Sequence, residues 1–502
     1  MSTPAHDLSS PFRFDNSFAR LPEPFFVAHQ PTVMPHPQLI RFNRSLSDEL
    51  GLDTAQLDSP QGVDIFAGSR IPNGALPLSM AYAGHQFGGY APRLGDGRAV
   101  LLGEVIDTQG VRRDIQLKGA GRTPFSRGGD GRAVLGPVLR EYILSESMHA
   151  LGIPTSRALA ATLTGETVMR ERPFPGAIFT RVARSHVRIG TFQYFAAQND
   201  TRSVQALADY VLQRHYPEAM NDEHPYDALF TAVLDAQAKL VAKWMHVGFI
   251  HGVMNTDNMQ IAGETIDYGP CAFMDSYDPD TVYSSIDRMG RYAYSNQPNA
   301  AYWNLAWLVR ALLPCMEKNP EIAAQRAQAI SDEFPQRYQA AWLAGMRAKL
   351  GLLTTDDHDE ALIKELLDCM HKQTADFTLT FRALSSLSSK KPQNSEHDAT
   401  IHALFDDPEA FEAWAIDWRA RLARENSDDA TRRAAMRTVN PAFIPRNHRV
   451  EEAIQAGLAG DFSVFETLLD VLVTPFEDKP GYEDFAQPPQ SHEVVQQTFC
   501  GT

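Results

Sequence analysis

The chain has 502 residues, a formal net charge of −16, a hydrophobic content of 43% and a mean hydropathy of −0.30. These values exclude a disordered chain, and the absence of a run of ~18 apolar residues excludes a helical membrane protein. The negative charge disfavours nucleic acid and membranes as partners, so a phosphate ligand would require a local cluster of arginines.

Two further features concern the cellular compartment. The N-terminal sequence lacks both a basic start with an apolar stretch and an Arg-rich amphipathic pattern, so we expect no targeting peptide. The cysteines show neither CxxC nor zinc spacing, and such sparse use is typical of a reducing compartment; they are Cys271, Cys315, Cys369 and Cys500. We therefore expect a cytoplasmic protein.

The first dense region predicts strands around one helix. Residues 98–107 and 112–119 alternate apolar and polar side chains, which predicts antiparallel strands after an Asp-Gly hairpin turn in LGDG. Helical spacing of apolar residues predicts a helix over 132–152 that ends at a glycine. The β-branched and aromatic residues of 172–195 favour strand again. This order indicates a small α+β lobe.

The remainder of the chain is mainly helical in pattern. Apolar spacing predicts helices at 226–248, 301–316, 360–373 and 449–473, and alternation around a turn predicts a β-hairpin at 258–268. We expect four parts along the chain, which are an N-terminal extension that packs on the next domain (1–75), the small lobe (76–195), a helical lobe with the hairpin (196–400), and a helical extension with a flexible tail (401–502).

The hairpin segment carries three oxygen-bearing side chains. Asp257 and Asn258 lie at its start and Asp267 at its end, so a hairpin would bring Asn258 and Asp267 together. Mg²⁺ prefers hard oxygen ligands and takes its remaining ligands from water and phosphates, which suits this pair. Asp257 would then be free to accept a proton from an attacking hydroxyl. The alternative is that Asn and Asp beside Gly only form turns.

A lysine and a glutamate strengthen this hypothesis. Lys118 ends the strand DIQLK, where Ile115 and Leu117 face one way while Gln116 and Lys118 face the other. Glu141 in the following helix could hold that lysine. A strand Lys, a helix Glu, an acid–base Asp and a metal Asp are the parts of a kinase-type phosphoryl-transfer site. The alternative is a surface ion pair that contributes ~0 to 1 kcal/mol.

Glycines and arginines add a possible phosphate site. The pentapeptide GDGRA occurs at 95–99 and 129–133, in segments without a Walker A motif, and bare backbone N–H groups beside arginines can cradle phosphates. Arg181, Arg184 and Arg188 follow one another in a half-buried region, and guanidinium groups bind phosphate bidentately. Ordinary turn chemistry and a solvated charge run remain the alternatives. We interpret His85 and His251 as hydrogen-bonded scaffold residues.

Together these motifs resemble the selenoprotein O family of kinase-like protein adenylyltransferases. The resemblance extends over most of the chain and is carried by YAGHQFGGYAPRLGDGRA, LKGAGRTPFSRGGDGRAVL, REYILSESMHALGIPT, FTRVARSHVRIGTFQYF, GVMNTDNMQIAGETIDYGP, NQPNAAYWNL, MRTVNPAFIPRNHRVEEAI and the C-terminal cysteine. It implies a two-lobed, protein-kinase-like α+β fold with a β-rich N-lobe and a larger helical C-lobe. It also implies Mg²⁺- or Mn²⁺-dependent transfer of AMP from an inverted ATP to Ser, Thr or Tyr of another protein. We expect the protein to be a monomer.

The resemblance assigns roles to individual residues. Asp257 would accept the proton, Asn258 and Asp267 would bind the metal, and Glu141 would orient Lys118. Nucleotide contacts would come from Asp267 and from Gly95, Gly97, Arg98, Lys118, Asp130, Gly131, Arg181 and Arg188. Cys500 lies where some members carry selenocysteine, which suggests a redox role.

One departure from ordinary kinases is visible. In those kinases the metal-binding Asn follows the catalytic Asp by five residues, whereas Asn258 is adjacent to Asp257 here, which argues against simple protein phosphorylation. Two alternatives to adenylylation remain open, namely Mn²⁺-dependent uridylylation from UTP and a catalytically silent nucleotide-binding scaffold.

Overall fold

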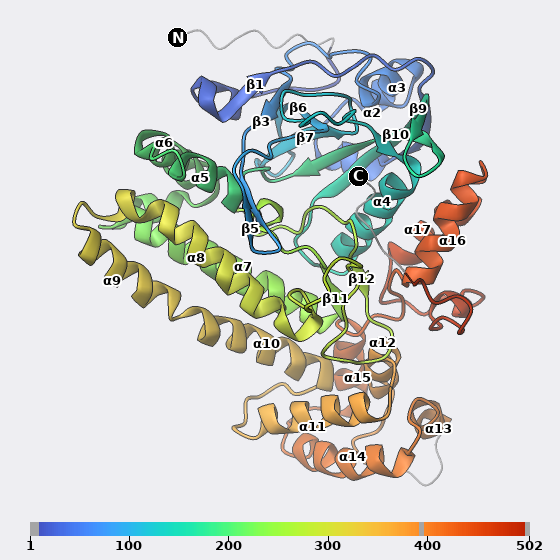
Figure 1. The fold of residues 1–502 in the computed structure, drawn as a ribbon. Coiled ribbons are helices and arrows are strands. Elements are labelled where there is room, and N and C mark those ends of the chain that lie inside the picture. Colours follow the sequence, from blue (N-terminus) through green and yellow to red (C-terminus); the bar gives the residue numbers. More distant parts are fainter. Residues whose placement is uncertain (1–9, 391–395, 497–502) are drawn as a thin grey trace.

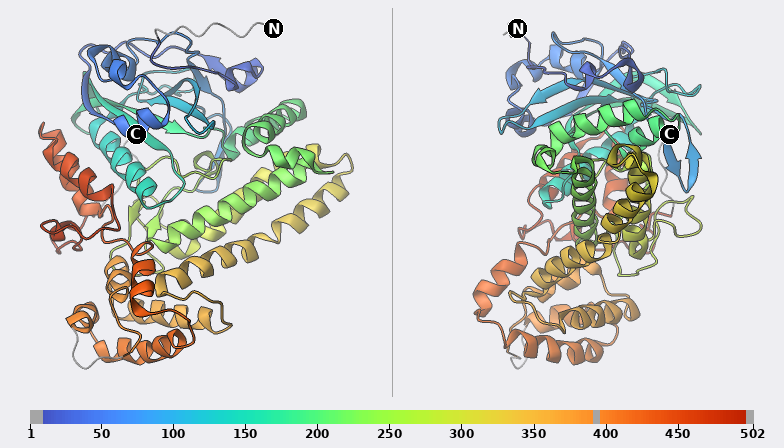
Figure 2. Two further views of the ribbon diagram at one scale, coloured as in Figure 1. Left: turned by 180° about the vertical axis from the view of Figure 1, so that it is seen from behind. Right: turned by 90° about the vertical axis from the view of Figure 1, so that its left-hand side faces the viewer.

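The computed structural model describes residues 10–390 and 396–496. A large β-sheet formed by the N-terminal part of the chain lies above a layer of long helices, and further helices lie below that layer (Figure 1). The views in Figure 2 show the same order of sheet, long helices and lower helices. The fold is therefore of mixed α and β composition, with a sheet-containing N-terminal part and a mainly helical C-terminal part, as the sequence predicts.

The main sheet has eight strands, and its pairings are antiparallel. Its ends, β1 and β2, come from residues 1–75, the segment that we expected to pack as an extension on the next domain. The predicted strands at 98–107 and 112–119 are β6 and β7. In spatial order the strands are β1 (Phe26–Ala28), β3 (Leu78–Met80), β6 (Ala99–Ile106), β7 (Arg112–Lys118), β10 (Pro173–Ala183), β9 (Arg157–Met169) and β2 (Gln38–Phe42), with β8 (Ala133–Val134) beside β10.

The two faces of β7 differ as predicted. Ile115 and Leu117 are buried in a core shared with the short N-terminal helices. Gln116 and Lys118 face the opposite side, where Lys118 meets α4 (Leu135–Ala150), the predicted helix at 132–152. The short helices that cover the first face are α1 (Arg44–Glu49), α2 (Thr54–Leu57) and α3 (Pro60–Phe66), with η1 (Phe18–Arg20) and η2 (Glu23–Phe25) before them.

The predicted Asp-Gly hairpin turn in LGDG is wrong. This segment connects β5 (Gly89–Ala91) to β6, and β5 pairs with β4 (Gly84–Gln86) in a separate two-stranded sheet. The backbone N–H groups of Leu94 and Gly95 both donate to the carbonyl of Tyr82. The segment is therefore held by a tertiary contact instead of by paired flanking strands.

The strand prediction for 172–195 is correct only in its first half. After β10 the chain forms α5 (Ile189–Ala196), where the N–H of Arg188 donates to Thr191 Oγ1 at 3.1 Å and caps the helix. Phe192 and Phe195 are buried in the core of the helical part. Because both helix and strand can bury such an apolar run, tertiary packing decides the outcome.

The predicted helix at 226–248 is α7 (Pro225–His246), which ends just before Gly248 in a left-handed conformation. The predicted helical run at 449–473 forms α16 (Asn447–Leu458) and α17 (Ser463–Leu472), separated by Gly460, which also has a positive φ. Both helices pack on α4 (Figure 1). The other helices are α6 (Thr201–His215), α8 (Gln297–Met316), α9 (Pro320–Ser331), α10 (Phe334–Leu350), α11 (Asp359–Lys372), α12 (Phe377–Leu384), α13 (Glu396–His402), α14 (Pro408–Leu422), α15 (Asp429–Arg437), η3 (Pro217–Asn221), η5 (Tyr294–Asn296) and η6 (Glu483–Phe485).

None of the helices within residues 10–390 and 396–496 combines the length and the apolar character needed to cross a membrane.

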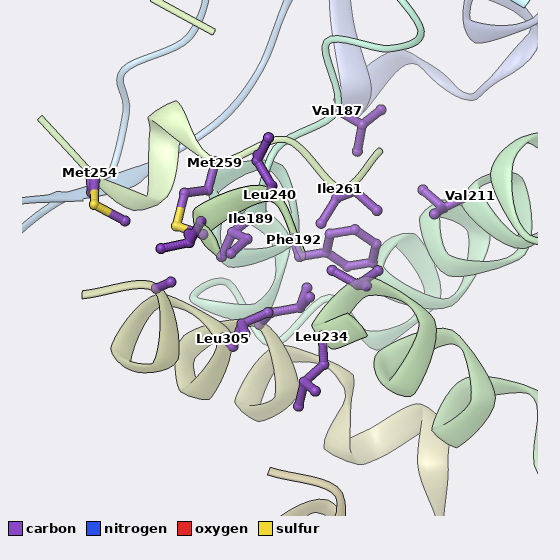
Figure 3. Close-up of a cluster of buried hydrophobic side chains, with 14 of the residues drawn as sticks. Val187, Ile189, Phe192, Val211, Leu234, Leu240, Met254, Met259, Ile261 and Leu305 are labelled. Carbon is purple, nitrogen blue, oxygen red and sulfur yellow. The ribbon is translucent and has the colours of Figure 1, made fainter. Parts of the chain in front are cut away.

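The predicted β-hairpin at 258–268 is not built from strands. The segment lies between β11 (Phe249–Ile250) and β12 (Ala272–Phe273), begins in η4 (Thr256–Asn258), and turns back through a single antiparallel bridge between Met259 and Thr265. Apolar packing holds it. Met254, Met259 and Ile261 lie in a buried cluster whose partners are Val187, Ile189, Phe192, Val211, Leu234, Leu240 and Leu305 (Figure 3).

Candidate active site

One cavity collects almost all of the predicted site residues. It has a volume of about 630 Å³ and is bordered by strands of the main sheet, the β4–β5 hairpin and the segment around η4. The predicted residues in its lining are Gly95, Gly97, Arg98, Lys118, Asp130, Gly131, Arg181, Arg188, Asp257, Asn258 and Asp267. Glu141 lies behind Lys118. Arg184 is not among the lining residues; its carbonyl accepts a hydrogen bond from Arg214 instead.

Lys118 links the two parts of the fold. Its Nζ lies 2.5 Å from Glu141 Oε2 and 2.7 Å from Asp267 Oδ1, so one ammonium group joins β7, α4 and the segment after η4. Burial by itself would raise the pKa of Asp267, but Lys118, Arg98 and Arg181 outweigh it and hold that pKa well below its usual range. Asp267 is therefore an anion that could bind a cation at neutral pH.

Two buried arginines also line the cavity: Arg181 lies on β10, and Arg188 directly precedes α5. Arg181 donates to Gln116 Oε1 through Nη2 at 2.5 Å and forms an ion pair with Glu141 at 3.2 Å. The guanidinium of Arg188 lies 4.1 Å from the ring centre of Tyr82. The Nε and Nη1 atoms of Arg188 have no hydrogen-bond partner within the described part of the chain. An anionic ligand would satisfy these donors, because buried guanidinium groups need hydrogen-bond acceptors.

Asp257 is buried beside the β4–β5 hairpin. Gln86 Nε2 donates to its Oδ2 at 3.3 Å, while Oδ1 has no hydrogen-bond partner among the residues described. Burial raises the pKa of Asp257 to about 6. The packing around it is tight, since a Cβ at Gly84 would lie 2.2 Å from Oδ1. A carboxylate with an elevated pKa and a vacant oxygen is suited to accept a proton from a hydroxyl.

The donor set around η4 fits a hard divalent cation. Asn258 Nδ2 donates to the carbonyl of Val253 at 3.1 Å, which leaves the amide oxygen for a ligand. Groups of three or more His, Cys, Asp or Glu that could hold a metal do not occur in the described ranges. Mg²⁺ needs no such group, because it is commonly bound by one or two side chains together with water and phosphates. Asn258 and Asp267 meet that requirement.

The two GDGRA repeats border the same cavity but use their aspartates differently. Asp96 of the first repeat is buried and accepts from the N–H of Met80 at 3.1 Å. Asp130 of the second repeat is exposed and accepts hydrogen bonds from both Nη groups of Arg170, at 2.7 and 3.0 Å. Gly131 has a φ of 69°, and a Cβ there would lie 2.1 Å from the carbonyl of Gly121. Only glycine suits this approach between the two loops.

Both histidines have the scaffold contacts that we expected. His251 Nε2 donates to the carbonyl of Ile266 at 2.9 Å, and its Nδ1 accepts from the N–H of Val253 at 3.3 Å. The ring of His85 lies 4.0 Å from that of Trp307, and its Nδ1 lies 2.8 Å from Gln193 Nε2. His251 thus links Val253, which precedes Asp257 in the chain, to Ile266, which directly precedes Asp267.

Sequence analysis missed several polar residues of the site, above all Gln86, Asp96 and Gln116. Gln86 belongs to GHQFGG, whose glycines could have indicated a tight hairpin turn. In the structure Phe87 and Gly88 form that turn and have positive φ values. The repeated GDGRA could have drawn attention to Asp96. No local pattern indicates that Gln116 contacts an arginine on β10.

The cysteines give no redox pair in the described part of the chain. Cys271 is buried, whereas Cys315 and Cys369 are partly exposed, and none of the three forms a disulfide within the described residues. Cys500, for which the resemblance suggests a redox role, lies outside the described residues.

Known proteins match the chain over nearly its full length. The family model described as "Protein adenylyltransferase SelO" matches residues 10–473. A protein described as "Protein nucleotidyltransferase YdiU" from Rhodopseudomonas palustris (strain BisB18) is 59% identical over 98% of this chain and 99% of its own length. A protein of the same description from Rhizobium meliloti (strain 1021) is 58% identical over 98% of this chain and 99% of its own length. The chain thus belongs to the SelO family of protein adenylyltransferases.

Proposed function

We propose that the chain transfers AMP from ATP to a Ser, Thr or Tyr hydroxyl of another protein, with ATP inverted in a kinase-like two-lobed fold. Residues 76–195 would form the smaller lobe and residues 196–400 the larger one, with extensions at 1–75 and 401–502. Membership in the family supports nucleotidyl transfer to protein. The arrangement of cations in the cavity supports the orientation of the nucleotide.

The observation that carries this proposal is the burial of the cations. Arg181 and Arg188 are only 3% and 4% exposed, and Lys118 meets Glu141 beside them. We call Lys118, Arg181 and Arg188 the phosphate clamp. Because the clamp is the most buried positive part of the cavity, it suits the β- and γ-phosphates, which carry most of the negative charge. The α-phosphate would then face Asp257 and the acceptor protein.

Each residue then has a defined role in the transfer. Asp257 accepts the proton of the attacking hydroxyl while the hydroxyl oxygen forms a bond to the α-phosphorus. The bond between the α-phosphorus and the bridging oxygen breaks, and pyrophosphate leaves with its negative charge stabilised by the clamp. Glu141 holds Lys118 in place, while Gly95, Gly97, Arg98, Asp130 and Gly131 border the rest of the nucleotide.

Asn258 and Asp267 would hold Mg²⁺ or Mn²⁺. When bound, the metal ion offsets the charge of the phosphates and helps to orient them. Asp267 remains ionised for this purpose, because Lys118 and two arginines keep its pKa low.

Labelled ATP tests the proposal directly. Label at the α-phosphate should appear on acceptor proteins, whereas label at the γ-phosphate should not, and the intact mass of an acceptor should rise by one AMP. Asp257→Ala should lower transfer about 10²- to 10⁴-fold while ATP still binds. Transfer of the γ-label instead would identify a conventional kinase and refute the proposal.

Two alternatives are resolved by the same assay. The relatives are described only as nucleotidyltransferases, so ATP and UTP should be compared with Mg²⁺ and with Mn²⁺. Greater transfer from UTP with Mn²⁺ would identify uridylylation. A silent scaffold would transfer neither nucleotide, and Asp267→Ala would then have no transfer to abolish.

A further inference from the structure

A continuous series of polar contacts runs behind the phosphate clamp. Asp96 Oδ2 accepts from Gln116 Nε2 at 3.1 Å, and Gln116 Oε1 accepts from Arg181 Nη2 at 2.5 Å and from Arg181 Nε at 3.2 Å. Arg181 continues the series to Glu141 at 3.2 Å, and Glu141 continues it to Lys118 at 2.5 Å. Gln116 therefore stands between a buried acid and the buried arginine of the clamp.

The chemistry of its neighbours determines the orientation of the Gln116 side chain. Arginine offers only donors and an ionised aspartate offers only acceptors, so the amide oxygen must face Arg181 and the amide nitrogen must face Asp96. Gln116 is fully buried in the middle of β7, where its register partner on β10 is Arg181 itself. Neither side chain can turn to water for a replacement partner, so the geometry of this pair is fixed.

Asp96 is hydrogen-bonded through Oδ2, while its Oδ1 has no hydrogen-bond partner among the described residues. Its Oδ2 also accepts from the N–H of Met80 at 3.1 Å, and its Oδ1 lies 3.6 Å from Arg188 Nη1. One buried carboxylate thus faces Arg188 directly but reaches Arg181 only through a neutral amide. A direct contact between Asp96 and Arg181 would add a second carboxylate to a guanidinium that already pairs with Glu141.

We infer that Gln116 is a positioning residue of the phosphate clamp, which holds the guanidinium of Arg181 for the far phosphates of a nucleoside triphosphate and separates it from the negative charge of Asp96. This inference rests on the proposed function only in requiring that the clamp binds the β- and γ-phosphates. It assigns no role in proton transfer to Gln116.

The test compares ATP with AMP, because AMP lacks the phosphates that the clamp would hold. Dissociation constants of both nucleotides are measured by calorimetry on the full chain with Mg²⁺. In Gln116→Leu the preference for ATP over AMP should fall about tenfold, since Arg181 loses its amide acceptor. Gln116→Glu should reduce the preference further, because it adds a carboxylate against Arg181 that offsets the charge of the guanidinium. Gln116→Met replaces the leucine variant if that variant does not fold.

A matched control separates positioning from a general effect on folding. Asn440 is another fully buried side-chain amide, whose Nδ2 donates to the carbonyl of Lys349 at 2.9 Å and to Ser385 Oγ at 3.0 Å, and it does not line the cavity. Asn440→Leu should leave the ATP preference unchanged, even if it lowers the melting temperature. If Gln116 had only a structural role, Gln116→Leu would weaken the binding of ATP and of AMP equally, and this result would overturn the inference.

A double-mutant cycle provides the sharper criterion. If Gln116 acts through Arg181, then Gln116→Leu should change the ATP preference by less than about twofold in an Arg181→Ala background. An equal loss in both backgrounds would overturn the inference. The binding result is independent of the labelling assay. Transfer of the γ-label would refute adenylylation, but the preference for ATP over AMP would still measure the effect of Gln116 on the clamp. A wild-type chain without a preference for ATP would refute the clamp and this inference together.

Discussion

Lys118 Nζ lies 2.7 Å from Asp267 Oδ1, and this ion pair joins the last residue of β7 to the segment after η4. The same ammonium group lies 2.5 Å from Glu141 Oε2. The sheet and the helical part are thus joined at the residues to which we assign the triphosphate and the metal. A disturbance at either carboxylate should therefore reach the nucleotide through Lys118.

Glu141→Gln tests this coupling. We expect kcat/KM for ATP to fall about 10- to 100-fold, because Lys118 and Arg181 lose the anion that they share. Transfer of α-labelled AMP measures the effect. Glu360 forms an exposed pair with Lys364 at 2.7 Å, so Glu360→Gln should leave activity within about twofold of wild type. Unchanged activity of Glu141→Gln would contradict the role assigned to it.

Gly84→Ala tests the close contact with Asp257. A Cβ would lie 2.2 Å from Asp257 Oδ1, and the hairpin cannot move away freely, because the N–H of His85 donates to Thr256 Oγ1 at 2.7 Å. We expect transfer to fall at least about tenfold as the carboxylate is displaced. In Gly89→Ala the added Cβ would meet its nearest atom at 3.5 Å, an ordinary contact. That control should retain activity, and equal losses in both variants would argue against a specific effect on Asp257.

Glu264 should make stability dependent on pH. Burial raises the pKa of its carboxyl from 4.5 to about 7, although it accepts from the N–H of Arg184 at 2.8 Å. The folded state thus binds this proton more tightly than the unfolded state, and the resulting stabilisation, of about 3 kcal/mol at most, is present below pH 4.5 and lost as pH rises through 7.

The effect of Glu264 is checked by measuring the melting temperatures of wild type and Glu264→Gln between pH 5 and pH 8. The variant should match wild type at pH 5, where the wild-type carboxyl is largely protonated in the folded state, and should melt at a higher temperature at pH 8. Glu360→Gln controls for the loss of a charge. A wild-type protein that is more stable than Glu264→Gln at pH 8 would show that Arg113, at 3.6 Å, outweighs burial.

Lys349 should show the opposite dependence on pH. Its ammonium group is buried, lies 4.2 Å from the ring centre of Phe381, and forms no ion pair with the described residues. Burial lowers the pKa of Lys349 from 10.5 to about 7. Because the folded state disfavours the charged form, the destabilisation is complete below pH 7 and is relieved as pH rises toward 10.5.

Lys349→Met should therefore raise the melting temperature at pH 6, and the gain should shrink toward pH 10. Methionine retains an unbranched apolar side chain, so the packing on Phe377 and Phe381 is largely preserved. Lys364→Met, at an exposed position, should show no such trend. A variant that melts below wild type at both pH values would indicate that contact with the two rings outweighs the cost of burying the charge.

Short-range patterns predicted much of the site. Alternation along β7 placed Lys118 opposite Ile115 and Leu117, and the structure confirms that division. The helical spacing after the second GDGRA repeat predicted α4, which carries Glu141 to the lysine. These inferences succeeded because side-chain direction in a strand or helix follows from the backbone repeat of that element alone.

Other features depend on neighbours far away in the sequence. Arg181 and Arg184 stand three residues apart, yet only Arg181 borders the cavity. Arg184 lies just after β10, where its N–H donates to Glu264 and its carbonyl accepts from Arg214. The turn from β10 to α5 at Arg188 follows from the packing of Phe192 and Phe195 in the helical core. Patterns of apolar residues do not distinguish these outcomes.

The sequence by itself determined which residue types meet in this chain: a strand lysine, a helix glutamate, an Asp-Asn pair and an Asp before Gly. Only the tertiary structure decided that Asp96 is buried while Asp130 is paired at the surface, although both occupy the same place in GDGRA. The physical reason is that burial and partners depend on the surrounding elements. Local sequence specifies the direction of a side chain, whereas charge, hydrogen bonding and pKa depend on what the fold places around it.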